Sequence, residues 1–279
     1  MSLPLPTSLS PSKLSSFTSC ALAFRFASID RLPEAPTVAT SRGTLVHAAL
    51  EHLFTLPAHE RVPDVADHCV EVALAAYRDD PEWAGLGLDG DAEVQVVDEA
   101  RRLVANYFRL EDPRAVVPMG VELKLEVELG DLRLRGIIDR LDLVDGELVV
   151  TDYKTGRSPS DVHARSRMEG VHVYSLMCER FFGRRPVRVQ LLHLAEPVAV
   201  MAEPSEQSTR ALERKLGAVW SAVETACARD DFRPRPSALC DWCSFRAWCP
   251  SWGGDPDRAR IDLEVETRAA SGQEPLLRV

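Results

Sequence analysis

The chain has 279 residues, of which 45% are hydrophobic, and it carries a formal net charge of −10 at pH 7. This size and content suffice for one large or two small domains with a buried core. No segment reaches the roughly 18 apolar residues of a membrane helix, and residues 1–11 are too short, polar and proline-broken for a secretion signal. We therefore expect a cytoplasmic protein without a membrane anchor, where reducing conditions favour metal binding over disulfides for the seven cysteines.

The hydrophobic pattern predicts helices and strands in mixed order. Ser10 before Pro11 is typical of a helix start, with serine as N-cap and proline in the first turn. Apolar spacing predicts further helices over residues 43–54, 65–77, 91–110, 165–182 and 206–229, with a loop over 79–90. Alternating or continuous apolar runs predict strands over 121–129, 131–143, 147–153 and 187–194, with Asp145-Gly146 as a hairpin turn.

These elements place the chain in the α/β class. Residues 43–194 follow the core order αβββαβ, and further helices lie before and after it. We expect a single domain over residues 1–254, with its core at 43–195. The segment 255–279 has few large apolar residues and is expected to be a loosely held tail.

Two neighbouring strands each deliver an acidic residue near their ends. Asp139 stands in Gly136-Ile137-Ile138-Asp139, and Asp152 is followed by Tyr153 and Lys154. Carboxylates are hard oxygen ligands for Mg²⁺ or Mn²⁺, and a nearby ammonium can orient a water molecule for attack on a phosphate. In a strand, Asp152 and Lys154 point to the same side. The pattern predicts a divalent-metal site, with the backbone carbonyl of Tyr153 as a further ligand.

The choice of lysine at position 154 strengthens this interpretation. Only four of the 33 basic residues are lysines, namely Lys13, Lys124, Lys154 and Lys215. An arginine stays protonated, whereas the pKa of a lysine responds to its surroundings. A single Asp-x-Lys sequence also occurs as an ordinary surface ion pair at a strand end, so the motif gains its weight from the strand that precedes it.

Together these segments resemble the RecB-like branch of the PD-(D/E)xK nucleases, which includes AddB nuclease domains and CRISPR-associated single-strand exonucleases. The resemblance spans roughly residues 10–250 and implies a restriction-endonuclease-like fold. It extends to residues 43–51, Gly-Thr-Leu-Val-His-Ala-Ala-Leu-Glu, where the family carries a metal-binding histidine on a helix. His47 is therefore expected to be a ligand, although a lone helical histidine is more often structural. Glu122 takes a strand position where the family often has an acid, and we expect it to support the site from outside the ligand set.

One departure from the family pattern concerns the helix after the last motif. RecB-like enzymes usually carry a glutamine four residues before a tyrosine that takes part in the active site. Tyr174 matches the tyrosine, but the glutamine position is Gly170. The resemblance thus implies catalytic roles for Asp139, Asp152, Lys154 and Tyr174, with one active-site hydrogen-bonding group missing.

Four cysteines form a second pattern. Cys240, Cys243 and Cys249 are spaced C-x₂-C-x₅-C, and Cys20 lies near the other end of the chain. Such thiolates can bind zinc or an iron–sulfur cluster, and the spacing alone does not separate the two. The resemblance to the iron–sulfur subgroup of RecB-like nucleases implies a structural [4Fe–4S] cluster that joins the segments 10–25 and 236–250. Cys69, Cys178 and Cys227 lie in apolar, helix-like stretches and are expected to be buried and inert.

The acidic net charge hides a local basic segment. Residues 154–190 contain eight basic and three acidic residues, and Arg157, Arg184 and Arg185 are expected to contact a phosphate backbone. The alternative is an ordinary solvated helix face. No G-x-x-x-x-G-K-[ST] phosphate loop occurs, so a helicase or recombination partner would have to supply any motor.

The leading hypothesis is a Mg²⁺- or Mn²⁺-dependent deoxyribonuclease, an exonuclease on single-stranded DNA or DNA ends in recombination or repair. Its metal ligands would be His47, Asp139, Asp152 and the Tyr153 carbonyl. One alternative is a non-catalytic iron–sulfur DNA-binding subunit of a larger complex, which the glycine at position 170 favours. Another is a zinc-stabilised protein that keeps only the fold.

Overall fold

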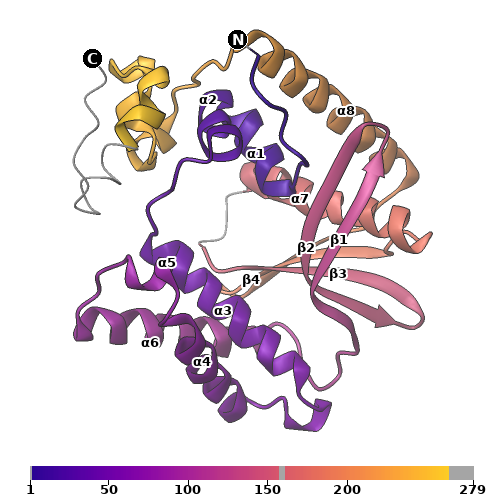
Figure 1. The fold of residues 1–279 in the computed structure, drawn as a ribbon. Helices are drawn as coiled ribbons and strands as arrows, with labels where there is room; N and C mark the ends of the chain where they lie inside the picture. The colour runs from indigo at the N-terminus through magenta and orange to yellow at the C-terminus, as the bar shows by residue number, and fades with distance from the viewer. Residues whose placement is uncertain (1, 157–160, 264–279) are drawn as a thin grey trace. The chain divides into compact units, whose positions relative to one another are not determined.

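The computed structural model describes residues 2–156 and 161–263, with the side chains of 161–167 and 169 left out. The chain forms two compact units (Figure 1). The central unit is Pro36–Arg214, and the terminal unit combines Met1–Ala35 with Lys215–Val279. The expected core at 43–195 lies inside the central unit, and the cysteine-bearing segments at both ends lie in the terminal unit. A single domain over 1–254 stays a prediction.

A five-stranded sheet forms the middle of the central unit. Its strands are β1 (Pro118–Leu129), β2 (Leu132–Val144), β3 (Glu147–Lys154), β4 (Arg188–His193) and β5 (Val198–Ala202), in the spatial order β1-β2-β3-β4-β5. Neighbouring strands are antiparallel except β3 and β4, which are parallel and connected through α7 (Asp161–Phe182). The α/β class and the four expected strands are confirmed, and β5 is an addition that the sequence analysis missed.

Two tight turns determine the pairing of the first three strands. Leu129 pairs with Leu132 across a turn in which Gly130 has φ of 59°. Val144 pairs with Glu147 across Asp145 and Gly146, whose φ values are 51° and 82°. Two consecutive positive φ angles characterise a type I′ turn, whose twist matches that of a hairpin. The long β1–β2 hairpin is visible as the pair of extended arrows in Figure 1.

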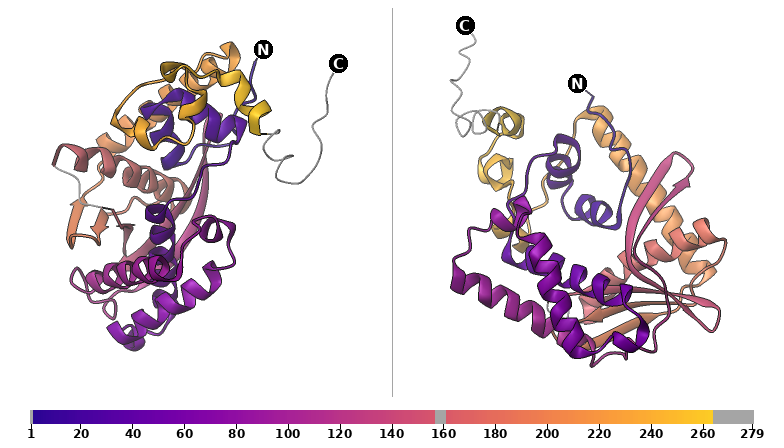
Figure 2. Two further views of the ribbon diagram at one scale, coloured as in Figure 1. Left: turned by 90° about the vertical axis from the view of Figure 1, so that its left-hand side faces the viewer. Right: turned by 60° about the horizontal axis from the view of Figure 1, so that its bottom comes forward.

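Helices pack against the sheet. Figure 2 shows α3 (Val38–Thr55), α4 (Pro63–Tyr77) and α6 (Gly90–Tyr107) side by side in both views. Their apolar faces form one core cluster with Tyr153 of β3 and Leu192 of β4, while α7 packs against β1, β2, β3 and β4. Because side chains of β3 alternate between two faces and are buried almost throughout, the centre of the sheet is covered on both sides.

Most predicted helix limits are close to those observed. The helix expected from Gly43 begins at Val38, since Thr37 caps it by accepting a hydrogen bond from the Thr40 amide. The expected loop over 79–90 contains the short helix α5 (Pro81–Ala84), capped by Asp80. No helix among the described residues is long and apolar enough to cross a membrane.

The terminal unit is built from both ends of the chain. It contains α1 (Pro11–Ser19), α2 (Ala21–Phe24), a π-helical turn (Arg25–Asp30), the C-terminal half of α8 (Glu206–Arg229) and four short 3₁₀ helices at Ala238–Trp242, Arg246–Trp248, Pro250–Trp252 and Pro256–Arg258. As predicted, Ser10 caps α1 by accepting from the Lys13 amide.

Contacts that involve no cysteine already join the two ends of this unit. Arg25 forms ion pairs with Asp30, with Asp230 after α8 and with Asp257 in the last 3₁₀ helix. The ring of Phe26 packs on Phe245 at a centroid distance of 5.4 Å. In the segment predicted to be a loose tail, Ala259 is buried and Arg260 pairs with Asp30; residues 264–279 lie outside the described part of the chain.

Candidate metal and active site

Three acidic residues lie in line across β1, β2 and β3. Glu122 and Asp139 occupy opposing positions, because Val121 pairs with Arg140 and Leu123 with Ile138 on either side of them. The β2–β3 pairing ends at Arg140 with Thr151, and Asp139 and Asp152 come one step beyond. Opposing residues of antiparallel strands have Cβ atoms about 5 Å apart. The pairing therefore gathers three carboxylates where β2 begins to leave β3.

Glu122 adopts a conformation that is unusual for its residue type. Its φ is 45°, in the left-handed region, although it stands inside a strand. Such a conformation costs about 1–3 kcal/mol for a non-glycine residue and tends to occur at functional sites. It turns the carboxylate to within 3.8 Å of the His47 ring, measured from Oε1 to Nδ1. Glu122 was expected outside the ligand set, but the structure places it among the groups that can hold an ion.

His47 reaches this cluster from α3. Its Nδ1 lies 3.5 Å from Asp139 Oδ2, and one ligand atom each from His47, Glu122 and Asp139 all lie within 4.8 Å of one another. One turn earlier on the helix, a Cβ on Gly43 would lie 3.2 Å from Thr155 Oγ1. The glycine therefore lets α3 approach the end of β3 closely, which brings His47 to the carboxylates.

The electrostatics of the cluster show an excess of negative charge. Burial and the charge of Asp152 raise the pKa of Asp139 to about 7, against the opposing effects of His47, the Tyr153 amide and Lys154. Burial alone would lower the pKa of His47, but Glu122, Asp139 and Asp152 outweigh it and the pKa is raised. Both shifts mean that Asp139 and His47 bind protons more readily than isolated groups do. A divalent cation would compensate the carboxylates better than these protons. The donor set of two carboxylates and an imidazole fits such a cation.

The remaining strand motif also converges here. Lys154 Nζ forms an ion pair of 2.5 Å with Asp152 Oδ2, as expected for residues two apart on one face of a strand. Between them, the Tyr153 amide donates a hydrogen bond of 2.7 Å to Asp139 Oδ2. The ring of Tyr153 is buried in the helical core on the other side. The structure thus brings together His47, Asp139, Asp152, Tyr153 and Lys154.

Tyr174 approaches from α7. Burial raises its pKa, and the charges of Asp152, Asp139 and Glu122 raise it further, so its hydroxyl is neutral. The tyrosine fits because of a glycine on β2: a Cβ on Gly136 would lie 2.7 Å from Tyr174 Cε1 and 3.2 Å from Met177 Sδ. Gly170 stands one turn before Tyr174 on α7 and brings no amide side chain to the site.

The four patterned cysteines lie together in the terminal unit. Cys20, Cys240, Cys243 and Cys249 line one pocket, with Phe26, Phe245 and Trp252 among its walls. Burial raises the pKa of the Cys243 thiol, and the other three cysteines raise it further against an opposing Phe245 amide. Among the described residues, no three cysteine sulfurs come within 4.8 Å of one another. The other cysteines, Cys69, Cys178 and Cys227, are buried, as predicted.

The structure describes two of the three arginines that are expected to bind DNA. Arg157 lies outside the described residues. Arg184, at the end of the α7–β4 segment, is exposed, whereas Arg185 pairs with Glu179 at 2.8 Å. An arginine already held by a carboxylate is less available for a phosphate, so Arg184 is the better placed of the two.

Comparison with known proteins identifies the family of the chain. A family model described as the PD-(D/E)XK nuclease superfamily matches residues 8–250. The chain belongs to the PD-(D/E)XK nuclease superfamily. The sequence has the letters of that name at Asp139 and at the Asp152-Tyr153-Lys154 triplet, while Ile138 stands where the name has proline.

Relatives of this superfamily member are distant in sequence. The gene 69 proteins of Mycobacterium phages D29 and L5 are each 24% identical to it, over 86% of this chain and 96% and 95% of theirs. Among solved structures, a candidate exonuclease from Eubacterium rectale is 11% identical, with a TM-score of 0.51 over 85% of this chain and 92% of its own. At this identity, the likeness concerns the fold.

The raised pKa values predict a pH-dependent metal affinity. At low pH, Mn²⁺ must displace protons from Asp139 and His47, so its affinity should rise by up to about tenfold per pH unit for each proton displaced, and level off once both groups are deprotonated. Calorimetric titration of metal-free protein between pH 6 and 8 measures this. Glu126→Gln, at an exposed acid on β1, should keep the same profile. A flat wild-type profile would contradict the prediction.

The same shifts affect the stability of the metal-free protein. Both groups have folded-state pKa values above their unfolded ones, so the stability they contribute at low pH is lost as pH rises through their folded-state pKa values, which is about 7 for Asp139. Mn²⁺ should therefore raise the melting temperature more at pH 8 than at pH 6.

Gly136 should be intolerant of alanine. The added Cβ must push the Tyr174 ring or the strand, and overpacking of this kind costs about 1–3 kcal/mol of unfolding free energy. Denaturant unfolding measures the loss. Gly136→Ala with Tyr174→Ala should cost less than the sum of the single changes, because the clash disappears. Gly217→Ala, where a Cβ meets open space, should be neutral or stabilising; equal losses for both glycines would refute the packing argument.

Proposed function

We propose that the protein is a divalent-metal-dependent deoxyribonuclease that acts on single-stranded DNA or DNA ends, in recombination or repair. The single observation that carries the proposal is the convergence of His47, Glu122 and Asp139 within 4.8 Å of one another, next to the Asp152–Lys154 ion pair. Superfamily membership supports nuclease chemistry, and the fold likeness to a candidate exonuclease supports action at ends. The preference for single strands, the pathway and the cytoplasmic location are all parts of the proposal.

The residues divide the work as follows. His47, Glu122, Asp139, Asp152 and the Tyr153 carbonyl would hold Mg²⁺ or Mn²⁺, which when bound polarises the phosphate and acidifies a water molecule. Lys154, fixed by Asp152, orients the attacking water, whose oxygen forms a bond to phosphorus. The attacking water releases a proton to solvent, the P–O bond to the leaving sugar oxygen breaks, and that oxygen takes up a proton from solvent. Tyr174 provides a neutral hydroxyl beside the cluster.

Substrate binding would use the basic segment that follows the motif. Arg184 is exposed, and Arg157 and Arg185 complete the set proposed to contact phosphates. Since the whole chain is acidic, this local charge would favour a path for DNA past Lys154 rather than elsewhere. A helicase or recombination partner would supply any unwinding.

We also propose a [4Fe–4S] cluster in the terminal unit. The shared pocket of Cys20, Cys240, Cys243 and Cys249 supports a four-thiolate ligand set. Zinc could use the same four thiolates, and the resemblance to the iron–sulfur subgroup of RecB-like nucleases is what favours the cluster. The cluster would reinforce the contacts that already join the ends of this unit.

A second function remains in competition. A non-catalytic DNA-binding subunit would share the fold, and the glycine at position 170 favours it because an active-site amide is missing. The two proposals differ in a direct assay of cleavage.

The catalytic proposal predicts that Asp152→Ala and Lys154→Ala each lower cleavage at least about 100-fold without unfolding the protein. End-labelled single- and double-stranded DNA with Mg²⁺ or Mn²⁺ provides the measurement. Glu128→Ala and Lys124→Ala, at exposed positions of β1, are matched controls and should cleave normally. Wild-type protein that binds DNA but never cuts it would favour the non-catalytic subunit.

The cysteine proposal predicts about four irons per chain in anaerobically purified protein. Cys20→Ser should lose the iron as completely as Cys243→Ser, because both sulfurs line the same pocket. Cys227→Ala, a buried cysteine of the same unit outside that pocket, should retain it. One zinc and no iron in the metal analysis would replace the cluster by a zinc site and leave the nuclease proposal untouched.

A further inference from the structure

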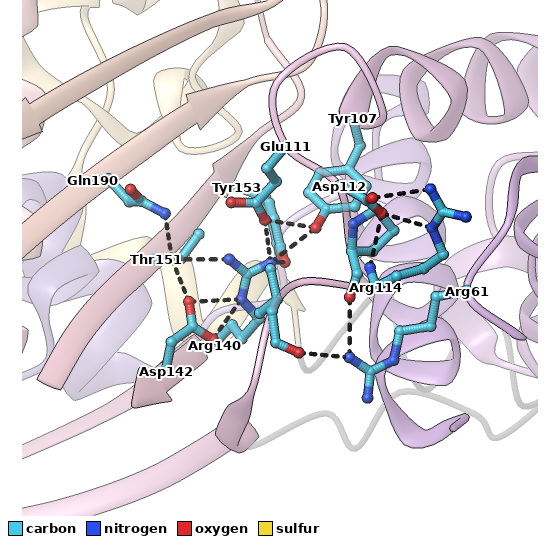
Figure 3. A network of polar contacts seen from close by, with 12 residues as sticks. Arg61, Tyr107, Glu111, Asp112, Arg114, Arg140, Asp142, Thr151, Tyr153 and Gln190 are labelled. Atoms are coloured by element: carbon cyan, nitrogen blue, oxygen red, sulfur yellow. Dashed lines mark hydrogen bonds and ion pairs between the residues drawn. The ribbon is translucent and has the colours of Figure 1, made fainter. Parts of the chain in front are cut away.

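A fully buried arginine lies directly behind the acidic cluster. Arg140 follows Asp139 on β2 and has 0% exposure. Its guanidinium reaches partners on β2, on β3 and after α6 (Figure 3). It pairs with Asp142 at 2.8 Å and Glu111 at 2.5 Å, and donates to the hydroxyls of Tyr153 at 2.7 Å and Tyr107 at 3.1 Å.

This environment compensates the charge of Arg140 closely. A buried charge is tolerated only when it is paired and hydrogen-bonded. Here two carboxylates and two phenol groups surround the guanidinium, which also lies 4.5 Å over the ring of Phe54. Because the fork of an arginine has fixed geometry, these partners are held at fixed positions relative to β2.

Tyr153 connects this network to the acidic cluster. Its hydroxyl accepts from Arg140, while its amide donates to Asp139 Oδ2 at 2.7 Å. Asp139 and Arg140 are successive residues, so their side chains leave β2 on opposite faces. A shift of Tyr153 would break one contact on each face. The position where β2 separates from β3 is therefore held from both sides.

We propose that Arg140 is a positioning residue for the metal site: by holding the Tyr153 hydroxyl, it fixes the backbone of β3 so that the Tyr153 amide orients the Asp139 carboxylate. The inference rests on the proposed metal-dependent function of that site. Arg140 itself touches neither the ion nor the substrate, and it acts through Tyr153.

Arg61 offers a matched control. It is also a buried arginine, with 7% exposure, and its guanidinium also lies over the Phe54 ring, at 5.1 Å from the ring centroid. It donates to the backbone carbonyls of Pro113 and Val116 at 3.1 and 2.9 Å. Among the contacts of the described residues, none joins Arg61 to Tyr153 or Asp139. Arg61→Lys keeps the charge that interacts with Arg140 and Asp142 and removes the hydrogen bonds to the carbonyls, so it should weaken the fold without reaching the metal site.

The decisive measurement is Mn²⁺ affinity of metal-free protein, by calorimetry or by the paramagnetic signal of free Mn²⁺. Tyr153→Phe keeps the ring and removes only the hydroxyl, and should weaken Mn²⁺ binding about 10-fold or more, the usual effect of losing a group that orients a ligand. Arg140→Lys keeps the charge but not the fork, and should weaken binding similarly. In cleavage assays, kcat should fall while KM for DNA stays within about twofold of wild type.

The control variant and the contrary outcomes distinguish failure of the positioning role from failure of the proposed nuclease function. Arg61→Lys should lower the melting temperature and leave Mn²⁺ affinity unchanged. If Arg140→Lys does not fold, Tyr153→Phe decides alone. Wild-type affinity in Tyr153→Phe would overturn the positioning role while the nuclease proposal stands. Absence of both Mn²⁺ binding and cleavage in the wild-type protein would overturn the proposed function, and this inference with it.

Discussion

The register of two hairpins is the constraint on which the site depends. The turn at Gly130 sets β1 against β2, and the turn at Asp145-Gly146 sets β2 against β3. A slip of one residue in either pairing would send every side chain of one strand to the other face. Glu122, Asp139 and Asp152 meet only in the observed registers. Residues far from the acids, at the hairpin tips, thus determine that the carboxylates converge.

Much of this arrangement could be predicted because its determinants are local. Short segments of the sequence suffice to recognise the strand patterns, the turn at Asp145-Gly146 and the Asp152-Tyr153-Lys154 triplet. Glu122 was not expected so close to His47 and Asp139, because it falls on the polar side of an alternating strand, where an acid resembles a solvent-facing residue. A signal did exist: counting back from the turn after Leu129 places Glu122 opposite Asp139. Its positive φ, which aims the carboxylate, has no sequence signal.

Other features depend on contacts between distant segments. The sequence did not distinguish Arg140 from other basic residues in strands, because its partners lie about thirty residues earlier. Tyr107 is the last residue of α6, and Glu111 follows that helix. The pairing of Arg185 with Glu179 depends on the geometry at the end of α7. The sequence analysis expected the segments 10–25 and 236–250 to be joined, but it contained no signal that they form a unit separate from residues 36–214.

The strand β2 is unusual for the middle of a covered sheet. Such strands are normally rich in Val, Ile and Leu on both faces, but β2 buries Asp139, Arg140 and Asp142 in succession around Leu141. One face holds carboxylates in excess, and the other holds a guanidinium that is fully compensated. The hydrophobic stabilisation of the central unit comes from the core cluster of α3, α4 and α6 and from apolar side chains buried in the sheet itself, such as Ile138, Val150 and Leu191. The charged groups of β2 therefore lie among apolar neighbours.

The discontinuous terminal unit has a consequence for biosynthesis. The central unit is one continuous stretch that ends at Arg214, so all of its residues leave the ribosome before the C-terminal part of the terminal unit emerges. It can collapse during translation, as domains generally do. Three residues of the terminal unit, Leu14, Leu22 and Phe24, are buried in the complete fold. They cannot reach that environment until α8 and the C-terminal segment emerge. Cys20 likewise gains its three companions only after Cys249 has been synthesised.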